Sequence, residues 1–565
     1  MKKPWELDPD RAEENESASS SAEKGAPKKE ARETDPLLAD GSGSLWQQAQ
    51  DGFGFFSFIL ELERHFGYKL MVLLFVCQHL LKGFANTFTL QAVPYLYAKY
   101  KVPAPQVQIF NGMTQLPWSM KPIIGLLSDV LPIFGYNKAP YMIITALLGA
   151  SAVLYVGLVP TSVLPVILVV CGLFLLSLQF STCDLLSEAK YAEKMATAPS
   201  HGPGLLTYVW AGLSVGGIVA LLLSGFTISK FGPQAVFCIA AVPVLMLFIP
   251  VGCGYLEEKQ VTSEELQKAR SSFYKQKEAC MLCVLMLVGS LSIIGVGLRF
   301  ASPAINCAVS VSVALVMLLA FSMVLSPVIA KFNAFSLVQA GLSLSISGAT
   351  FYFYTDTPEK YKDGPHFTPY FFNSVMGTLG QVMSLFGIIL YQKYFSTWKY
   401  RHLLLFTNIV NTLLCVLDVA MFARLNKRVG IPDHYFVLGL SVFETIIQQW
   451  MWMPQVVILS FLCPKGMEAT MYALLAGCHN LGNTIALNSG ALLLQVFGCR
   501  PDGSDGEDAQ FDNLWKAAAV ASAFPMLSLL ALYRLIPDAY QNERLVGDKT
   551  SDATAGSLWR RWTDS

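Results

Sequence analysis

Long apolar stretches separated by short polar segments dominate this 565-residue chain. A helix that spans a bilayer needs about 20 predominantly apolar residues. Fourteen stretches meet that length: 68–93, 105–127, 140–160, 162–184, 204–228, 233–256, 279–299, 304–330, 333–355, 367–392, 400–423, 434–461, 467–495 and 513–536. They are too long for the strands of a membrane β-barrel and lack dyad alternation. The pattern therefore predicts an all-α membrane protein with about 14 transmembrane helices.

The composition supports a bilayer as the solvent of this chain. Hydrophobic residues make up 53% of the sequence and charged residues only 14%, against about 25% charged residues in ordinary soluble proteins. More than half of the charged residues lie in two tails, one mid-chain segment and one segment near the C-terminal end. The net charge is zero, so we expect no nucleic-acid partner, and membrane lipid is the expected surrounding.

A charged segment in the middle of the chain divides six predicted helices from eight. Since transporters often consist of two six-helix halves, we expect two of the eight to form an additional pair. The predicted parts are a disordered N-tail (1–60), an N-terminal half (61–256), a linker (257–278), an extra helix pair (279–330), a C-terminal half (331–537) and a C-tail (538–565). An even number of spans places both tails on one face, and lysines and arginines in the linker favour a cytosolic face.

The N-tail carries one short motif. It lacks the apolar segment of a secretory signal peptide, but its stretch from Glu33 to Leu38 resembles an acidic dileucine sorting signal. Glu33, Leu37 and Leu38 are thus candidate contacts for a sorting adaptor, and an unremarkable tail is the alternative. The expected location is the plasma membrane or an endolysosomal or vacuolar membrane.

The twelve cysteines do not predict a metal site. Most lie in or beside apolar stretches, which is typical of small buried thiols. Cys280 and Cys283 form a CxxC pair, yet no second pair or histidine cluster completes it in the sequence. We expect neither a metal nor a cofactor.

Polar residues recur at helical spacing in four of the predicted spans. Ionisable residues within a membrane are functional candidates by default, because burying a charge there costs at least a few kcal/mol. The stripes comprise Gln78, Lys82 and Asn86; Asn111, Gln115, Trp118 and the adjacent Lys121; Glu444, Gln448 and Gln455; and Thr470, Asn480 and Thr484. Together they favour a shared water-filled cavity, while hydrogen bonding between helices is the alternative for any single Gln or Asn.

Three segments resemble a known family. They are LPWSMKPIIGLLSDVLPIFGYNKAPYM (116–142), DLLSEAKYAE (184–193) and CPKGMEATMYALLAGCHNLGN (463–483). They resemble the signatures of the folate–biopterin transporter family, which belongs to the major facilitator superfamily. The resemblance implies two six-helix halves and a proton-linked carrier of folates, pterins or related solutes. Because the family also contains carriers of other metabolites, S-adenosylmethionine is an alternative substrate.

The chemistry of a folate-like solute suggests roles for the polar stripes. Trp118 offers an aromatic plate for a pterin, and Lys82 and Lys121 offer cations for carboxylates. Glu444 is a candidate for the amino edge of the pterin. The remaining candidates for substrate binding are Gln78, Gln115, Gln448 and Asn480.

Proton coupling needs a group whose protonation changes with conformation. The candidates are Asp418 and Glu444, since a carboxyl group responds strongly to burial and to nearby charge. The alternative to proton coupling is that these acids form ion pairs with lysines that only stabilise the structure.

The segment after the second span resembles the loop that holds the halves together in the superfamily. We expect a gate there, composed of Gly125, Asp129, Gly135, Lys138, Asp184 and Glu188. Asp129 is expected to accept hydrogen bonds from a helix N-terminus, and the two glycines to allow close backbone approach. Asp184 and Glu188 lie four residues apart and repel unless a cation such as Lys138 or Lys190 intervenes.

Two other classes of function deserve comparison with a carrier. A membrane enzyme would need a convergent catalytic constellation, which the sequence does not contain near its membrane histidines, so we expect no enzyme. A receptor-like protein would keep the fold and bind a ligand without moving it.

Overall fold

The computed structural model describes residues 54–275, 277–462, 468–543 and 553–563. The candidate sorting residues Glu33, Leu37 and Leu38 lie outside the described residues, as does 463–467 within the third signature segment. The chain separates into two units, Met1–Phe58 and Ile59–Ser565. The second unit is helical throughout and has no β-strand among its described residues, so the predicted all-α class is confirmed.

The first span before the linker changes from an α-helix to a π-helix and back to an α-helix. Many of the later spans start at a proline, whose missing N–H and fixed φ suit the first turn of a helix. These elements are α3 (Tyr68–Leu74), the π-helix η2 (Phe75–Asn86), α4 (Thr87–Lys99), α5 (Ala104–Ser119), α6 (Lys121–Val130), α7 (Ala139–Leu158), α8 (Val166–Thr197), α9 (Gly202–Phe231), α10 (Pro233–Met246) and α11 (Phe248–Gly252). A short helix, α2 (Gly54–Phe66), precedes them, and the 3₁₀ turn η3 (Pro199–His201) precedes α9.

The linker and the chain after it are also helical. The linker holds α12 (Ser263–Lys275). The later elements are α13 (Lys277–Arg299), α14 (Pro303–Val324), α15 (Pro327–Leu342), α16 (Ser347–Thr355), η4 (Tyr370–Met376), α17 (Gly377–Leu390), η5 (Tyr391–Phe395), α18 (Tyr400–Phe422), α19 (Leu425–Arg428), α20 (Asp433–Phe461), α21 (Glu468–Val496), α22 (Leu514–Ala523), α23 (Met526–Leu535) and α24 (Leu558–Thr563).

Eleven helical segments of the described chain are long and apolar enough to cross a membrane. They correspond to eleven of the fourteen predicted spans. The other three predicted spans are the helices α5–α6, α20 and α21, which do not meet the same criterion of length and composition. These three carry polar stripes that the sequence assigns to a cavity, and this explains their less apolar composition.

The two groups of helices meet along α5 and α21. Small residues allow the close approach, as in other membrane helix pairs. A Cβ atom on Gly477 would lie 3.0 Å from the carbonyl oxygen of Ser119. Across the same contact, Thr484 Oγ1 donates to the carbonyl oxygen of Gly112 at 3.4 Å.

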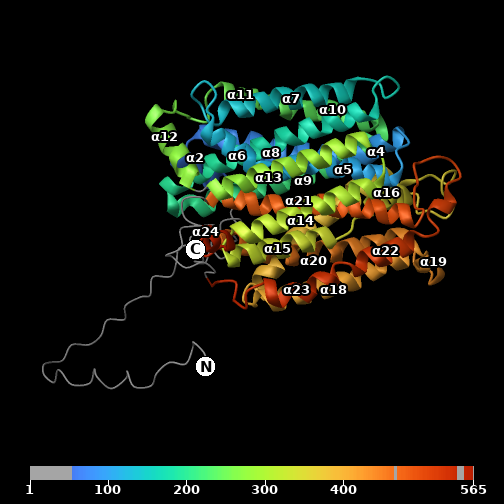
Figure 1. Cartoon of the computed structure of the whole chain (residues 1–565). Coiled ribbons are helices and arrows are strands. Elements are labelled where there is room, and N and C mark those ends of the chain that lie inside the picture. The colour runs from blue at the N-terminus through green and yellow to red at the C-terminus, as the bar shows by residue number, and fades with distance from the viewer. Residues whose placement is uncertain (1–53, 276, 463–467, 544–552, 564–565) are drawn as a thin grey trace, which may run out of the picture. The chain divides into compact units, whose positions relative to one another are not determined.

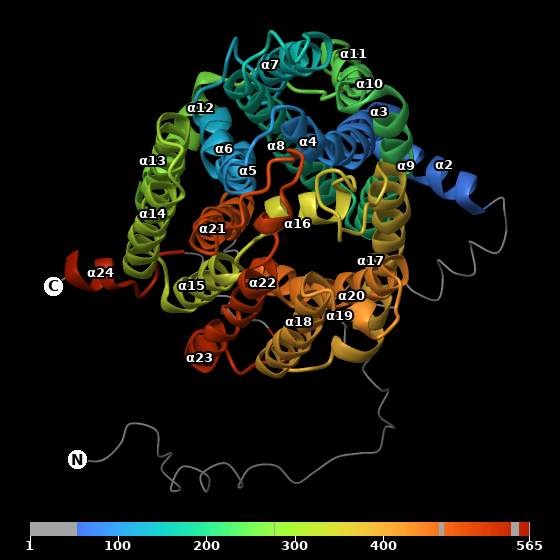
Figure 2. The same ribbon diagram turned by 90° about the vertical axis from the view of Figure 1, so that its right-hand side faces the viewer.

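A second contact between the groups joins α9 to η4 and α17. Ser374 Oγ donates to the carbonyl oxygen of Leu221 at 2.9 Å and accepts from the Gly225 amide at 3.2 Å. Helices α13 and α14 instead lie at one edge, beside α5 and α21 (Figure 2). The elements α12 and α24 lie at one end of the helices, on the left in Figure 1, which we call the linker face.

At the opposite face, on the right in Figure 1, the loop after α16 lies beside the loop before α22. Two carboxyl groups are buried in these loops. Asp356, directly after α16, is 4% exposed, and Glu507 is 8% exposed. Glu507 accepts hydrogen bonds from the amides of Asp502 and Gly503 at 2.8 and 3.0 Å. The Lys360 ammonium lies 3.9 Å from Asp356 Oδ1. Burial, followed by the hydrogen bond and charge of Glu507, raises the pKa of Asp356 to about 8.

This pair should make stability depend on pH. The pKa of Asp356 is higher in the folded protein than its ordinary value of about 3.9, so the folded state holds a proton that the unfolded state lacks. Stability should therefore fall as the pH rises from about 4 to about 8, because over this range the unfolded state has released a proton that the folded state still holds. We expect Asp356→Asn to remove this component from the apparent melting temperature in detergent.

The matched control is Asp505→Asn, which changes an exposed acid of the loop that carries Glu507. It should keep the pH profile of the wild type. An unchanged profile in Asp356→Asn would show that Asp356 does not carry the extra proton.

Candidate functional site

A buried carboxylate on α8 gathers charged groups from two other helices. Asp184 is 1% exposed. Lys82 Nζ lies 2.7 Å from its Oδ1, and Lys121 Nζ lies 2.5 Å from its Oδ2. Gln78 donates to Oδ1 at 3.0 Å. Because an unpaired charge would be very costly in this environment, Asp184 fixes both lysines in place.

The cluster also contains Glu188, one turn further along α8. Its Oε1 lies 3.4 Å from Lys82 Nζ, so the two lysines and two acids balance in charge. The sequence assigned the lysines to a cavity and the acids to a gate, whereas the structure brings them together. It also corrects the expected intermediary between Asp184 and Glu188, which is Lys82. Lys138 and Lys190 instead approach Glu193 at 2.6 and 4.0 Å.

The π-helix η2 positions the first stripe. Its wider turn still places residues four apart near one side, and Gln78 and Lys82 both reach Asp184. Asn86, a further four residues along, lines a cavity instead. The predicted stripe therefore divides between the charge cluster and the cavity.

The first cavity has a volume of about 460 Å³ and is lined by elements of both groups of helices. Amide and aromatic side chains dominate its polar wall: Asn86, Asn111, Gln115, Trp118 and Asn480. Asn480 also donates from its side chain to the carbonyl oxygen of Trp118 at 3.3 Å. Three of the predicted substrate-binding residues, Gln115, Trp118 and Asn480, thus share one cavity.

Trp118 connects this cavity to the charge cluster. The Lys121 ammonium lies 4.8 Å from the centroid of the Trp118 ring, a cation–π distance. Lys82 lies similarly, 5.7 Å from the ring of Trp210. Gln78, Lys82 and Lys121 are not among the residues that line the cavity, although the sequence predicted them as substrate-binding residues.

The second cavity, of about 470 Å³, holds the two predicted coupling acids and shares Ser347 with the first. Asp418 from α18 and Glu444 from α20 line it together with Gln448. Gln448 donates to Glu444 Oε1 at 3.1 Å. Neither acid forms a salt bridge within the part of the chain that the structure describes. The alternative of a lysine partner is therefore seen at Asp184 and not at these acids.

The predicted gate lies on the linker face, but a different acid caps its helix. Three successive amides at the start of α7 donate to Glu258. Those of Asn137 and Lys138, just before the helix, donate to Oε1 at 2.8 and 2.7 Å, and that of Ala139, its first residue, donates to Oε2 at 3.0 Å. Such a terminus attracts anions. The sequence expected Asp129 in this role. Glu258 was missed because the linker that carries it is distant in sequence.

The two gate glycines have different surroundings. Gly135 has φ of +82°, which favours glycine, and its carbonyl oxygen accepts from the Val261 amide at 2.9 Å. A Cβ atom on Gly125 would meet only Leu185, at an ordinary 3.5 Å. Close backbone approach is thus not the reason for glycine at position 125.

Further ion pairs fasten the linker to the first group of helices. Glu257 lies 2.8 Å from Lys194 and 3.6 Å from Lys69. The hydrogen bond from Lys194 lowers the pKa of Glu257. Arg270 of α12 donates to the carbonyl oxygen of Val130 at 3.2 Å, at the end of α6. These contacts hold the linker against α6, α7 and α8.

Comparison with known sequences matches this chain to one family model and to several transporters. The sequence model of the BT1 family matches residues 82–555. The chain is 25% identical over 468 residues to "Probable folate-biopterin transporter 6" of Arabidopsis thaliana, covering 82% of each chain. It is 27% identical over 422 residues to "Folate-biopterin transporter" of Synechocystis sp., covering 74% of this chain and 72% of that protein. "Folate transporter 2" of Plasmodium falciparum is 24% identical, covering 81% and 87%.

Solved structures match the fold at low identity. A peptide transporter POT, crystallised with sulfate, superposes with a TM-score of 0.56 at 14% identity, covering 83% of this chain and 96% of that one. A D-xylose–proton symporter superposes with a TM-score of 0.52 at 13% identity, covering 84% and 97%. The arrangement of helices is thus of the major facilitator type, as predicted.

Removing the central anion should destabilise the protein. Asp184→Asn leaves two buried lysines with only Glu188, and breaking a buried pair costs roughly 3–5 kcal/mol. We expect a clear drop in apparent melting temperature. Because Lys121 pairs with Asp184 while Lys82 also has Glu188, the double variant Asp184→Asn/Lys121→Gln should recover part of the loss.

Glu193→Gln is the control, because it alters a more exposed pair with Lys138, worth about 1 kcal/mol or less. If Asp184→Asn has the same apparent melting temperature as this control, the stability of the protein does not depend on the charge of Asp184.

Proposed function

Because this chain belongs to the BT1 family, we propose that it is a secondary active carrier that moves a folate- or pterin-like solute across a membrane by alternating access. The family and its relatives are transporters and not enzymes. The observation that carries the proposal is the 460 Å³ cavity, whose walls come from both groups of helices. A cavity shared in this way changes its openings when the groups rock against each other.

The lining of this cavity suits a flat, hydrogen-bonding solute. Its volume lies within the range of about 300–1,000 Å³ that is usual for ligand pockets. Trp118 offers a surface for stacking a pterin ring. The side-chain amides of Asn86, Asn111, Gln115 and Asn480 both donate and accept hydrogen bonds, as the edge of a pterin does. Gln448 and Glu444 offer further contacts in the adjoining cavity.

One of the two lysines, Lys82 or Lys121, serves the negative end of the solute after a movement that brings it to the cavity. Both are already paired with Asp184, so a substrate carboxylate gains most where it displaces the weaker partner. That partner is Glu188, at 3.4 Å from Lys82. We therefore assign Lys82, supported by Gln78, to an incoming carboxylate, and Lys121 chiefly to holding Asp184 and Trp118.

Asp418 and Glu444 carry the proton in this mechanism. Two acids that face one cavity without a cation gain from sharing a proton. A proton taken up from one side and released to the other would couple transport to a pH gradient. Their position beside the substrate cavity, through the shared Ser347, supports this assignment.

The gate comprises Gly125, Asp129, Gly135 and Lys138 on the linker face, together with the cap that Glu258 provides. In this proposal the two halves are 61–256 and 331–537, and α13 and α14 form the additional pair at one edge. Both tails are cytosolic, in the plasma membrane or an endolysosomal or vacuolar membrane.

Ligand binding tests the substrate class. In a thermal-shift panel of folate, methylfolate, biopterin and S-adenosylmethionine, we expect the first three to stabilise the purified protein, by about 2.7 kcal/mol at a hundredfold excess over Kd. Trp118→Ala should weaken that binding about three- to tenfold through lost stacking. Trp398→Ala, which changes a tryptophan outside both cavities, is the control. Stabilisation by S-adenosylmethionine alone would remove the folate assignment.

Uptake into proteoliposomes tests coupling. An imposed pH gradient should drive accumulation by the wild type. Asp418→Asn and Glu444→Gln should reduce it to the level without a gradient while exchange of internal for external substrate continues, because exchange needs no net proton movement. Glu63→Gln, at an exposed position on α2, should behave as the wild type. Wild-type uptake that ignores the gradient would exclude proton symport.

A further inference from the structure

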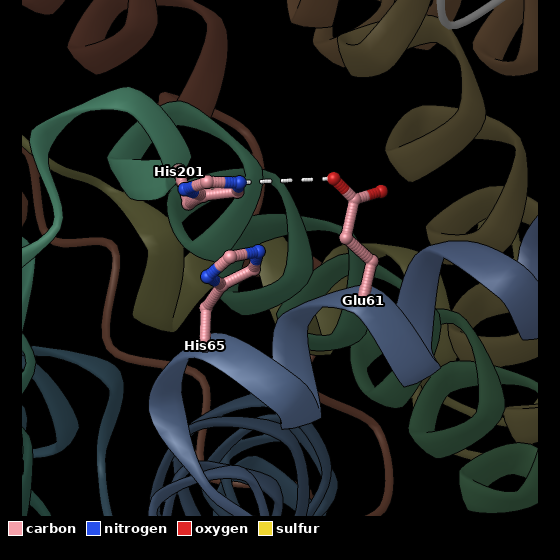
Figure 3. A group of neighbouring side chains, drawn as sticks. All are labelled: Glu61, His65 and His201. Atoms are coloured by element: carbon pink, nitrogen blue, oxygen red, sulfur yellow. Dashed lines mark ion pairs between the residues drawn. The ribbon is translucent and has the colours of Figure 1, made fainter.

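We propose that Glu61, His65 and His201 form a binding site for a divalent transition-metal ion on the linker face, with Zn²⁺ as the best-matched ion. One ligand atom of each residue lies within 4.8 Å of the other two. Figure 3 shows the two imidazole rings and the carboxylate converging on one space from two elements. This site is separate from both cavities and from the charge cluster around Asp184.

The backbone supplies the ligands from ordered helical elements. Glu61 and His65 lie four residues apart on α2, so they share one side of that helix. The adjacent side of α2 is packed against the protein, since Leu62 and Phe66 are 2% and 5% exposed. His201 ends η3, directly before α9. Ligands on such elements hold their geometry better than ligands on loops.

A hydrogen bond orients the histidine from η3. Ser200 Oγ lies 3.0 Å from His201 Nδ1, which leaves Nε2 on the side of Glu61, 3.8 Å from its Oε1. Metal-bound histidines commonly have their second ring nitrogen engaged in this manner. Ser200 is therefore a positioning residue for the site.

The spacing is close to that of a coordinated ion. Ligand bonds of about 2.0–2.1 Å in a tetrahedral arrangement place ligand atoms about 3.3 Å apart. The rings of His65 and His201 are stacked, with centroids 3.6 Å apart, and two stacked rings cannot both point at one ion. Turning the exposed His65 ring about its side-chain bonds and drawing the ligand atoms together by at most about 1.5 Å, from separations within 4.8 Å, completes the geometry.

The donor set selects the class of metal. Two imidazole nitrogens and one carboxylate suit Zn²⁺, Co²⁺ and Ni²⁺, whereas Ca²⁺ and Mg²⁺ prefer oxygen ligands. Glu61 and His65 are exposed, so water can supply a fourth ligand. A bound ion would fasten α2, which precedes the first span, to the beginning of α9.

Metal titration tests the site directly. The full-length protein is purified with a tag that contains no histidine and titrated with Zn²⁺ by calorimetry and with Co²⁺ by absorption spectroscopy. We expect one ion per chain and a Co²⁺ spectrum that Zn²⁺ abolishes. His65→Ala, His201→Ala and Glu61→Gln should each weaken binding more than about tenfold, and Ser200→Ala about tenfold.

His402→Ala is the matched control, because it removes another exposed histidine at the start of α18. It should bind metal as the wild type does. All variants are compared for melting temperature, and Glu61→Gln, which changes an exposed residue, decides the question if a histidine variant fails to fold. No saturable Zn²⁺ binding, or binding equal in the wild type and Glu61→Gln, would overturn the proposal.

Discussion

The pairing of Asp184 with Lys82 and Lys121 is the constraint around which this molecule is organised. It draws η2, α6 and α8 together at one buried point. Within a membrane a single uncompensated charge is costly, so the three groups are tied to one another. The same pairing aims Lys121 at the Trp118 ring, which forms part of the cavity wall. Structure and chemistry at the proposed site therefore depend on the same carboxylate.

The two groups of helices differ in their electrostatics. The charge cluster before the linker is balanced, with two lysines and two acids in contact. The acids Asp418 and Glu444 after the linker have no such partner among the described residues. In the function we propose, this asymmetry places substrate anions at the first group and protons at the second. The cavities meet at Ser347, so both processes act on neighbouring volumes.

The sequence predicted the spanning helices, because their long apolar stretches are visible along the chain. Helical spacing placed Gln115 and Trp118 together on α5, whereas the packing of α21 against α5 brings Asn480 to the same cavity. The sequence did not predict that Lys82 and Lys121 pair with Asp184, since this pairing depends on how α8 packs against η2 and α6. Asp129, nine residues before Lys138, could be proposed as a helix cap, whereas Glu258 could not, because only folding brings the linker to α7.

The proposed metal site also shows that a sequence does not reveal contacts between distant segments. The spacing of Glu61 and His65 on one helix is visible in the sequence, but His201 joins them only in three dimensions. The match of the BT1 family model to residues 82–555 shows the family of this chain. The residues that distinguish one solute from another have to be identified in the cavity.

Alternating access is the central claim, and side-specific labelling of one cavity residue tests it most directly. Gln115→Cys, in a variant without reactive native cysteines, is exposed to a membrane-impermeant thiol reagent from either face of sealed vesicles. The account predicts labelling from both faces, protection by substrate, and a shift between the faces in Asp129→Asn. Labelling from one face only, under all conditions and with transport intact, would contradict it, and unchanged accessibility in Asp129→Asn with reduced transport would remove the gate.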